Sequence, residues 1–284
     1  MLPQFDNNLS ASLFLWVENR LLNNAQAYVN LTTRLYHTPD PSLGTGYVAY
    51  AAPYKQWVYD SGVAGAEIIN SVSGNFGTYE RGDNGLKIDY NNGRVILDAS
   101  VGTNLIMTGS YAFKEVNFYA QPDTHEQVYS EYTDGKFVRN PMYNNSGQTG
   151  ASPNSIMTPA VFITKLNGMN EPFAMGGQQN SVRGFSFLIL ADSQYQVDVF
   201  SSVMTDARDK YIPLLDIKDD PINEWGDLKS GYNYNNLKNS KNTAGNLVFI
   251  DSVDASKVSD RYRGPDTVYL GICNIDLSFP RLTF

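Results

Sequence analysis

Acidic side chains on neighbouring predicted strands are the first candidates for chemistry in this sequence. Asp89, Asp98 and Glu115 fall in a passage that has the pattern of successive β-strands. Two carboxyl groups held roughly 5 to 10 Å apart can act as the acid and the nucleophile or base of a glycoside hydrolase. Acidic residues are so frequent in this chain that such pairs arise by chance. We keep a glycoside hydrolase as an alternative and predict that the protein is not an enzyme and has no catalytic residues.

Few residues in this sequence could support histidine-dependent catalysis or a histidine-containing metal site. The chain has two histidines, His37 and His125, and neither has a nearby serine or cysteine placed as a nucleophile. Asp123, His125 and Glu126 could supply ligands to a divalent metal. Because this group follows Pro122 in a polar passage, we favour a solvated turn. We predict no metal site at these residues.

A second acidic group, Asp216, Asp219 and Asp220, could bind calcium. Its spacing departs from the D-x-D-x-D-G loop pattern, and Pro221 interrupts it. A solvated acidic loop fits the pattern better. The sequence also has no G-x-G-x-x-G or Walker-type phosphate loop. We therefore expect no cofactor.

Aromatic residues are dense between residues 47 and 59. The group comprises Tyr47, Tyr50, Tyr54, Trp57 and Tyr59. Tyrosine buries a large area while keeping a polar tip, so such a group suits a sugar-stacking or protein-docking surface. Filling of a β-sheet core explains the same pattern equally well.

Charge and composition narrow the classes of partner. The net charge is −8 and the pI is about 4.8, and no Lys/Arg cluster occurs, so we expect no sequence-specific nucleic-acid partner. No apolar stretch approaches the roughly 20 residues of a membrane-spanning helix, and the first residues lack the pattern of a secretory signal. We expect no membrane partner and assembly in a cytoplasm.

The single cysteine, Cys273, lies in an apolar run and is predicted to be a buried hydrophobic residue.

The elements that would position these residues are mostly strands. Leu9, Leu13, Trp16, Val17 and Leu21 recur at helical spacing and predict an opening amphipathic helix with one buried face. A strand is expected at 28–35 and two short strands around Pro53. Alternating apolar residues separated by Asn/Gly turns then predict a meander of three antiparallel strands over 82–119.

The second half has a different pattern. Apolar strands are predicted at 160–164, 184–191 and 267–277, with a helix after Asp192 and a long polar loop near 216–245. The passage 141–155 is rich in turn residues and is predicted to be a linker. The expected fold is therefore α+β and β-rich. An N-terminal helix and an antiparallel β-sandwich-like domain (1–140) precede a smaller α+β domain (156–284).

Three passages resemble virion structural proteins of tailed bacteriophages. They are TRLYHTPDPSLGTGYVAYAAPYKQWVYDSG, the predicted meander GLKIDYNNGRVILD…MTGSYAFKEVNFY, and FITKLNGMNEPFAMGGQQNSVRGFSFLILADSQYQVDVFSSVMTDARD. The last is similar to connector and tail-terminator modules, whose small α+β domains pack side by side into rings. The resemblance runs from about residue 9 to residue 277 and implies a neck, head–tail connector or tail component.

The resemblance implies a mechanical function. We expect a homo-oligomeric ring in the virion, assembled in the cytoplasm of a host bacterium, with portal, adaptor or tail proteins as neighbours. A receptor- or glycan-binding module of a tail fibre or tailspike is the alternative. The residues predicted to form interfaces are Leu13, Trp16, Val17, Tyr54, Trp57, Ile222, Trp225, Leu228, Tyr232 and Tyr234.

Overall fold

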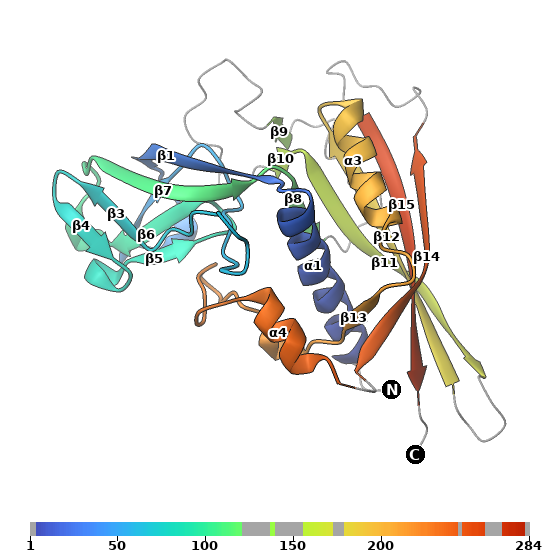
Figure 1. The fold of residues 1–284 in the computed structure, drawn as a ribbon. Helices are drawn as coiled ribbons and strands as arrows, with labels where there is room; N and C mark the ends of the chain where they lie inside the picture. The colour runs from blue at the N-terminus through green and yellow to red at the C-terminus, as the bar shows by residue number, and fades with distance from the viewer. Residues whose placement is uncertain are drawn as a thin grey trace.

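The chain forms two β-rich lobes with a long helix between them (Figure 1). The structure, a computed structural model, describes residues 4–120, 137–139, 156–172, 179–243, 246–258 and 269–281. The α+β, β-rich class predicted from the sequence is confirmed. Three α-helices belong to the described residues: α1 (Gln4–Asn24), α3 (Gln194–Thr205) and α4 (Tyr234–Lys241). None of them is long and apolar enough to cross a bilayer.

The first lobe is a curled, seven-stranded sheet in the order β4-β3-β7-β1-β2-β6-β5. Its strands are β1 (Tyr28–His37), β2 (Tyr47–Ala51), β3 (Ser71–Gly74), β4 (Gly77–Glu80), β5 (Lys87–Asp89), β6 (Arg94–Asp98) and β7 (Met107–Lys114). All pairs are antiparallel. Strand β1 joins the two parts of the sheet, because most of its length pairs with β7 and its last two residues pair with β2.

The predicted three-stranded meander is wrong in its third strand. The hairpin β5–β6 forms as expected, with its turn at 90–93. The next strand, β7, pairs with β1 and β3 instead of β6. Local turn patterns set the hairpin, whereas the long register between β1 and β7 depends on residues about 80 positions apart in the chain.

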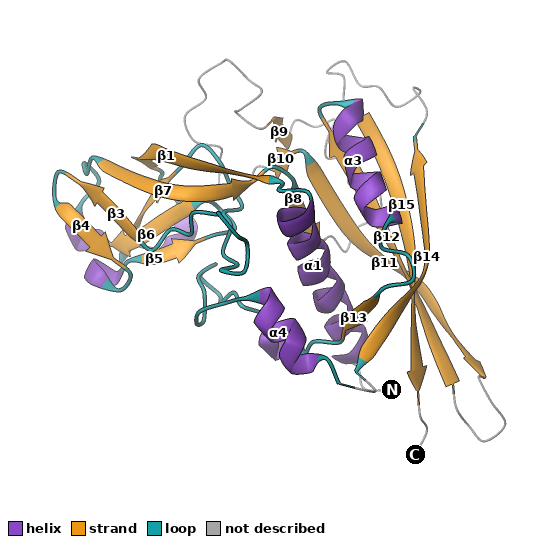
Figure 2. Cartoon of the chain, viewed as in Figure 1, coloured by secondary structure: helices purple, strands orange, loops and turns teal. Residues whose placement is uncertain are grey.

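The second lobe is a six-stranded sheet in the order β13-β14-β15-β12-β11-β8 (Figure 2). Its strands are β8 (Asn117–Ala120), β11 (Ala160–Pro172), β12 (Gln179–Ala191), β13 (Tyr211–Pro213), β14 (Leu247–Lys257) and β15 (Tyr269–Arg281). A short parallel pair, β9 (Phe137–Arg139) and β10 (Ile156–Thr158), lies beside it. The apolar strands predicted at 160–164, 184–191 and 267–277 are present and are longer than predicted.

The lobes do not follow the predicted division of the chain. Strand β8 precedes residue 140 yet pairs in parallel with β11 of the second sheet. Helix α1 also packs on that sheet, through Phe5 against Phe279 and Phe14 against Phe118. One continuous apolar core includes residues of both lobes. The predicted linker, 141–155, lies outside the described residues.

Helix α1 is buried on nearly every side, and not on one face as its apolar stripe predicts. Beyond the predicted stripe, Phe5, Ser12, Leu15, Glu18 and Leu22 are also buried. Helix α3 covers the same face of the second sheet with Val197, Phe200 and Met204. Its N-cap is Ser193, whose hydroxyl accepts a hydrogen bond from the Gln196 amide, where the sequence indicated Asp192. Cys273 is buried, as predicted.

Trp16→Ala tests the role of α1 within the single chain. The indole is 7% exposed and lies under the Arg20 guanidinium. Its removal should lower the free energy of unfolding by about 3 to 5 kcal/mol, because the lost contacts leave a cavity. This loss is measured by urea unfolding, monitored by backbone circular dichroism because that signal does not depend on Trp16. Asn7→Ala, at an exposed position of the same helix, is the control and should change stability by less than about 0.5 kcal/mol. A Trp16→Ala variant as stable as that control would contradict the packing of this helix.

Candidate functional site

The segment 216–243, here called the strap, crosses from the second lobe to the first. The sequence predicts a long polar loop at 216–245, but the structure places a 3-10 turn, Ile217–Asp219, and helix α4 within it. The backbone amide of Tyr234 donates to the Asp60 carboxylate over 3.0 Å, and that of Ser61 donates to the Tyr232 carbonyl over 3.0 Å. Burial of both tyrosines anchors the strap beside α1 and the first lobe (Figure 1).

The acidic residues at the start of the strap act as caps. The Asp216 carboxylate accepts from the Lys218 amide, and the Asp219 carboxylate accepts from the Asp216 amide. The Asp220 carboxylate accepts from the Ile222 amide. These bonds use the carboxylates within their own turns, and the described residues include no group of three potential metal-ligating side chains. The candidate metal group at 123–126 lies outside the described residues.

The centre of the strap closes on the β5–β6 hairpin. Trp225 lies against the ring of Tyr47, with 5.1 Å between centroids, and the Lys87 ammonium lies 3.5 Å from the Trp225 ring centroid. Gly226 follows with φ +78°, and its carbonyl accepts from the Tyr90 amide over 3.0 Å. A Cβ on Gly226 would lie 2.2 Å from an Asp89 carboxylate oxygen. Glycine is therefore required at this contact on both steric and conformational grounds.

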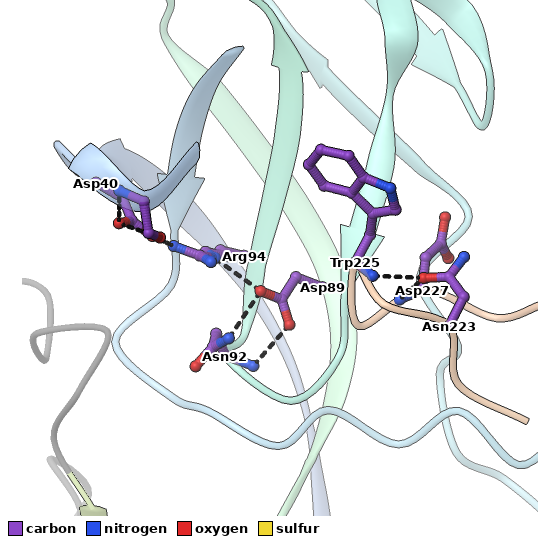
Figure 3. A network of polar contacts seen from close by, with 8 residues as sticks. Asp40, Asp89, Asn92, Arg94, Asn223, Trp225 and Asp227 are labelled. Carbon is purple, nitrogen blue, oxygen red and sulfur yellow. Dashed lines mark hydrogen bonds and ion pairs between the residues drawn. The ribbon is translucent and has the colours of Figure 1, made fainter. Parts of the chain in front are cut away.

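A buried ion network lies beside this contact (Figure 3). Arg94 donates from Nε to Asp89 over 2.8 Å and from one Nη to Asp40 over 2.5 Å. Asp89 also accepts from the backbone and side chain of Asn92. Burial opposes the Arg94 charge, but the two carboxylates outweigh it and raise the pKa of Arg94. Hydrogen bonds from Ser42, followed by the one from Arg94, lower the pKa of Asp40.

This network forms the floor of a polar cleft of about 540 Å³. One wall is the turn at Ser42 and Leu43, and the other is the strap at 223–226. Asn223 shapes the second wall, because its side-chain oxygen accepts from the amides of Trp225 (2.8 Å) and Asp227 (3.2 Å) (Figure 3). The floor and the second wall are thus fixed by hydrogen bonds within the chain.

The carboxylates proposed for a glycoside hydrolase do not converge on this cleft. Asp89 is 2% exposed and is engaged by Arg94 and Asn92. Asp98 ends β6 and is not among the lining residues of the cleft. Glu115 follows β7, which β1 and β2 separate from β6 in the sheet. Burial raises the pKa of Glu115.

A second buried ion pair joins α1 to the first lobe. The Lys114 ammonium at the end of β7 contacts the Glu18 carboxylate of α1, which also accepts from the Tyr59 hydroxyl over 2.6 Å. Lys114 is 3% exposed and lies 4.6 Å from the Tyr59 ring centroid. Burial lowers the pKa of Lys114 to about 7. Removal of either Lys114 or Glu18 would leave the other charge buried without its partner, which destabilises the fold.

The far end of the second sheet carries exposed apolar side chains. Paired positions run across five strands in one row: Met169 faces Val182, Val182 faces Ser278, Ser278 faces Phe249, and Phe249 faces Tyr211. The outer residues of this row, Met169 and Tyr211, are each 59% exposed. At this level β11 has passed the end of β8, so within the described residues both lateral edges of the sheet are open.

Most residues predicted to form interfaces are instead used inside the chain. Leu13, Val17 and Trp57 are fully buried, and Trp16 is 7% exposed. Tyr54 is half-buried and stacks on Phe113. The strap residues Ile222, Trp225 and Leu228 are half-buried, whereas Tyr232 and Tyr234 are buried.

The aromatic group at 47–59 is accordingly no continuous surface. Tyr50, Trp57 and Tyr59 belong to the core, and Tyr47 reaches the strap beside Trp225. His37 ends β1 with its ring 5.7 Å from that of Tyr50, whereas His125 lies outside the described residues. Sequence reasoning missed Arg94, Met169 and Tyr211. Their only sequence signal was a single charged or large side chain within a strand.

Comparison of the sequence with protein-family models and with curated proteins found no match.

A double-mutant cycle tests the buried pair. Glu18→Gln should lower the free energy of unfolding by about 3 to 5 kcal/mol, because it leaves the Lys114 ammonium buried without its carboxylate. Adding Lys114→Met removes that charge, so the double variant should be more stable than Glu18→Gln alone. Urea unfolding of both single variants and the double variant measures the coupling. Strictly additive losses would show that the two groups do not interact.

Gly226→Ala tests the closure of the strap. The new methyl group must displace Asp89 or the strap at a positive φ, which should cost about 1 to 3 kcal/mol locally. Opening of the strap in Gly226→Ala should give faster amide hydrogen exchange at 221–231. The Tyr90 amide, which donates a hydrogen bond to the Gly226 carbonyl, should also exchange faster. Gly231→Ala is the matched control, because a Cβ there meets nothing within 4 Å. Equal exchange in the two variants would contradict the predicted contact.

Proposed function

We propose that this chain is a structural subunit of a tailed-phage virion that forms a homo-oligomeric ring at the neck, the head–tail connector or the tail. The observation that carries the proposal is the cross-strand row that ends in Met169 on one edge of the second sheet and in Tyr211 on the other. An open strand edge with exposed apolar residues is a template for pairing with another chain.

The two edges suit a head-to-tail contact between copies. Met169 and Tyr211 lie at the same level of the sheet, so β11 of one copy beside β13 of the next would continue the row. The added pair would be parallel, as the β8–β11 pair of this sheet already is. A contact between two different surfaces of the same chain generates a closed ring or an open filament.

The location of these residues agrees with a role in assembly. In Figure 1 the ends of β11, β12 and β15 project beyond α1 and α3. Leu166 belongs to the projecting part and is 43% exposed. Its side chain packs over Gly184, which lies on the same face of β12 as Val182, the partner of Met169. Leu166 and Met169 therefore share one face of the sheet. The base of this arm is held by Asp6 of α1, whose carboxylate pairs with Lys165 (2.5 Å) and Arg183 (3.1 Å). The arm is thus held firmly at its base and presents apolar side chains at its end.

Mixing two edge variants tests the proposed contact. Light scattering and negative-stain images should show rings of one order for the unmodified chain, and monomers for Met169→Asp and for Tyr211→Asp. Each variant keeps one intact surface, so an equimolar mixture should give dimers and nothing larger. At concentrations too low for rings to form, the variants and the unmodified chain should have the same melting temperature, because both side chains are more than half exposed.

The control is Ile106→Asp, which changes a residue of the first lobe that is 49% exposed and should leave the rings intact. An unmodified chain that stays monomeric at high concentration would contradict the proposal, as would rings that survive both edge variants. Mass spectrometry of purified phage particles that encode this sequence tests the virion location. Absence of its peptides from the particles would exclude a structural role there.

A further inference from the structure

The cleft between the β5–β6 hairpin and the strap has the features of a ligand site that the assembly role does not use. Its volume, about 540 Å³, lies in the range of small-molecule sites. The cleft is on the first lobe and the strap, whereas Met169 and Tyr211 lie on the second sheet. A ligand bound here would leave the proposed contact between copies free.

The lining is polar and offers both donors and acceptors. Asn91, Asn92 and Asn223 contribute side-chain amides, and Glu224 contributes an exposed carboxylate. The Asn223 oxygen already accepts from two backbone amides and the Asn92 NH₂ group already donates to Asp89, so Asn223 offers mainly donors and Asn92 mainly an acceptor. The Arg94 guanidinium is 7% exposed and lines the cleft floor, with Nε and one Nη directed to Asp89 and Asp40. Within the described part of the chain, its other Nη forms no hydrogen bond.

Electrostatics favour a neutral ligand. The charge of Arg94 is matched by Asp40 and Asp89, and Glu224 adds a further negative charge, so an anion finds no excess positive charge. Lys55 lies near Arg94, and burial followed by the repulsion of that guanidinium lowers its pKa to about 8; it stays mostly protonated at neutral pH, but the two cations face the two carboxylates of Asp40 and Asp89 and leave no excess positive charge. The absence of a cluster of three metal-ligating groups among the described residues also gives a cation no built site.

A second cavity, lined partly by residues of α1, shares two lining residues with the cleft. It also measures about 540 Å³, and Asn91 and Asn223 line both spaces. Its other walls are more apolar and include Phe14, Leu15 and Ile222. An elongated ligand would therefore meet amide and carboxylate groups at one end and apolar side chains at the other.

We propose that this cleft binds a neutral saccharide chain. Sugar hydroxyl groups both donate and accept, so they match the side-chain amide of Asn91, the side-chain NH₂ group of Asn223 and the carboxylate of Glu224. The apolar C–H faces of further sugar units fit the cavity beside Phe14. Because the hydrogen bonds of Asp89, Arg94 and Asn223 already fix the walls, little ordering accompanies binding.

The proposal is tested with three neutral probes: maltoheptaose, cellohexaose and N-acetylchitohexaose. Saturation-transfer NMR and calorimetry should detect at least one of them at a millimolar or lower dissociation constant. The matching disaccharide should bind more weakly, because it cannot span both spaces. Asn91→Ala combined with Glu224→Ala should weaken binding by at least about tenfold. Neither side chain forms a hydrogen bond or ion pair within the described residues, so the variant should fold normally.

Asn235→Ala combined with Glu80→Ala, both at exposed positions outside the cleft, is the matched control and should bind like the unmodified chain. Inorganic phosphate and heparin are tested in parallel. The proposal is overturned if none of the neutral probes binds, if the cleft variant binds as well as the control, or if only the two anions bind.

Discussion

The burial of α1 on nearly every side is the constraint on which the rest of this structure depends. A helix with Leu13 and Val17 buried on one side and Leu15 and Leu22 buried on the opposite side cannot be covered by one sheet. The second sheet and α3 cover part of it, the first lobe covers another part, and the strap closes the remainder. The two lobes are therefore held together by a shared core, although their strands form separate sheets.

Polar groups of α1 fix how the lobes sit around it. The Ser12 hydroxyl accepts from the Leu215 amide just before the strap, and Glu18 meets Lys114 at the end of β7. Arg20 donates to the Val203 carbonyl of α3 over 3.0 Å. Such bonds are directional, so each defines one position for the element that it contacts. The apolar core holds the parts together, and these polar contacts determine their register.

The two surfaces proposed for function lie on different parts of this arrangement. The end of β11 projects beyond α1 and α3 and β13 lies beside α1, whereas the polar cleft lies where the strap meets the first lobe. Under the two proposals, the sheet edges and the cleft are separate surfaces, so pairing with copies would leave the cleft accessible to a ligand. Both surfaces are held by well-packed elements, the arm by Asp6 and the cleft by Arg94.

The sequence by itself determined the local elements. The spacing of Leu9, Leu13 and Val17 specifies a helix, and the Asn/Gly turn after Asp89 specifies the β5–β6 hairpin. Both depend on residues only a few positions apart, and both were predicted. The β-rich class and the buried state of Cys273 follow from the same kind of local pattern.

Only the tertiary structure decided the contacts between distant segments. No pattern in the sequence pairs β7 with β1, places β8 in the second sheet, or brings Gly226 onto Asp89. The strap is a polar passage rich in Asn and Lys, which is a pattern typical of a solvated loop. Its few aromatic residues nevertheless anchor it, because α1 and the first lobe provide a surface against which they are buried. The exposure of Met169 and Tyr211 was also decided by the tertiary structure, because an apolar strand residue lies in the core or at the surface according to which elements cover it.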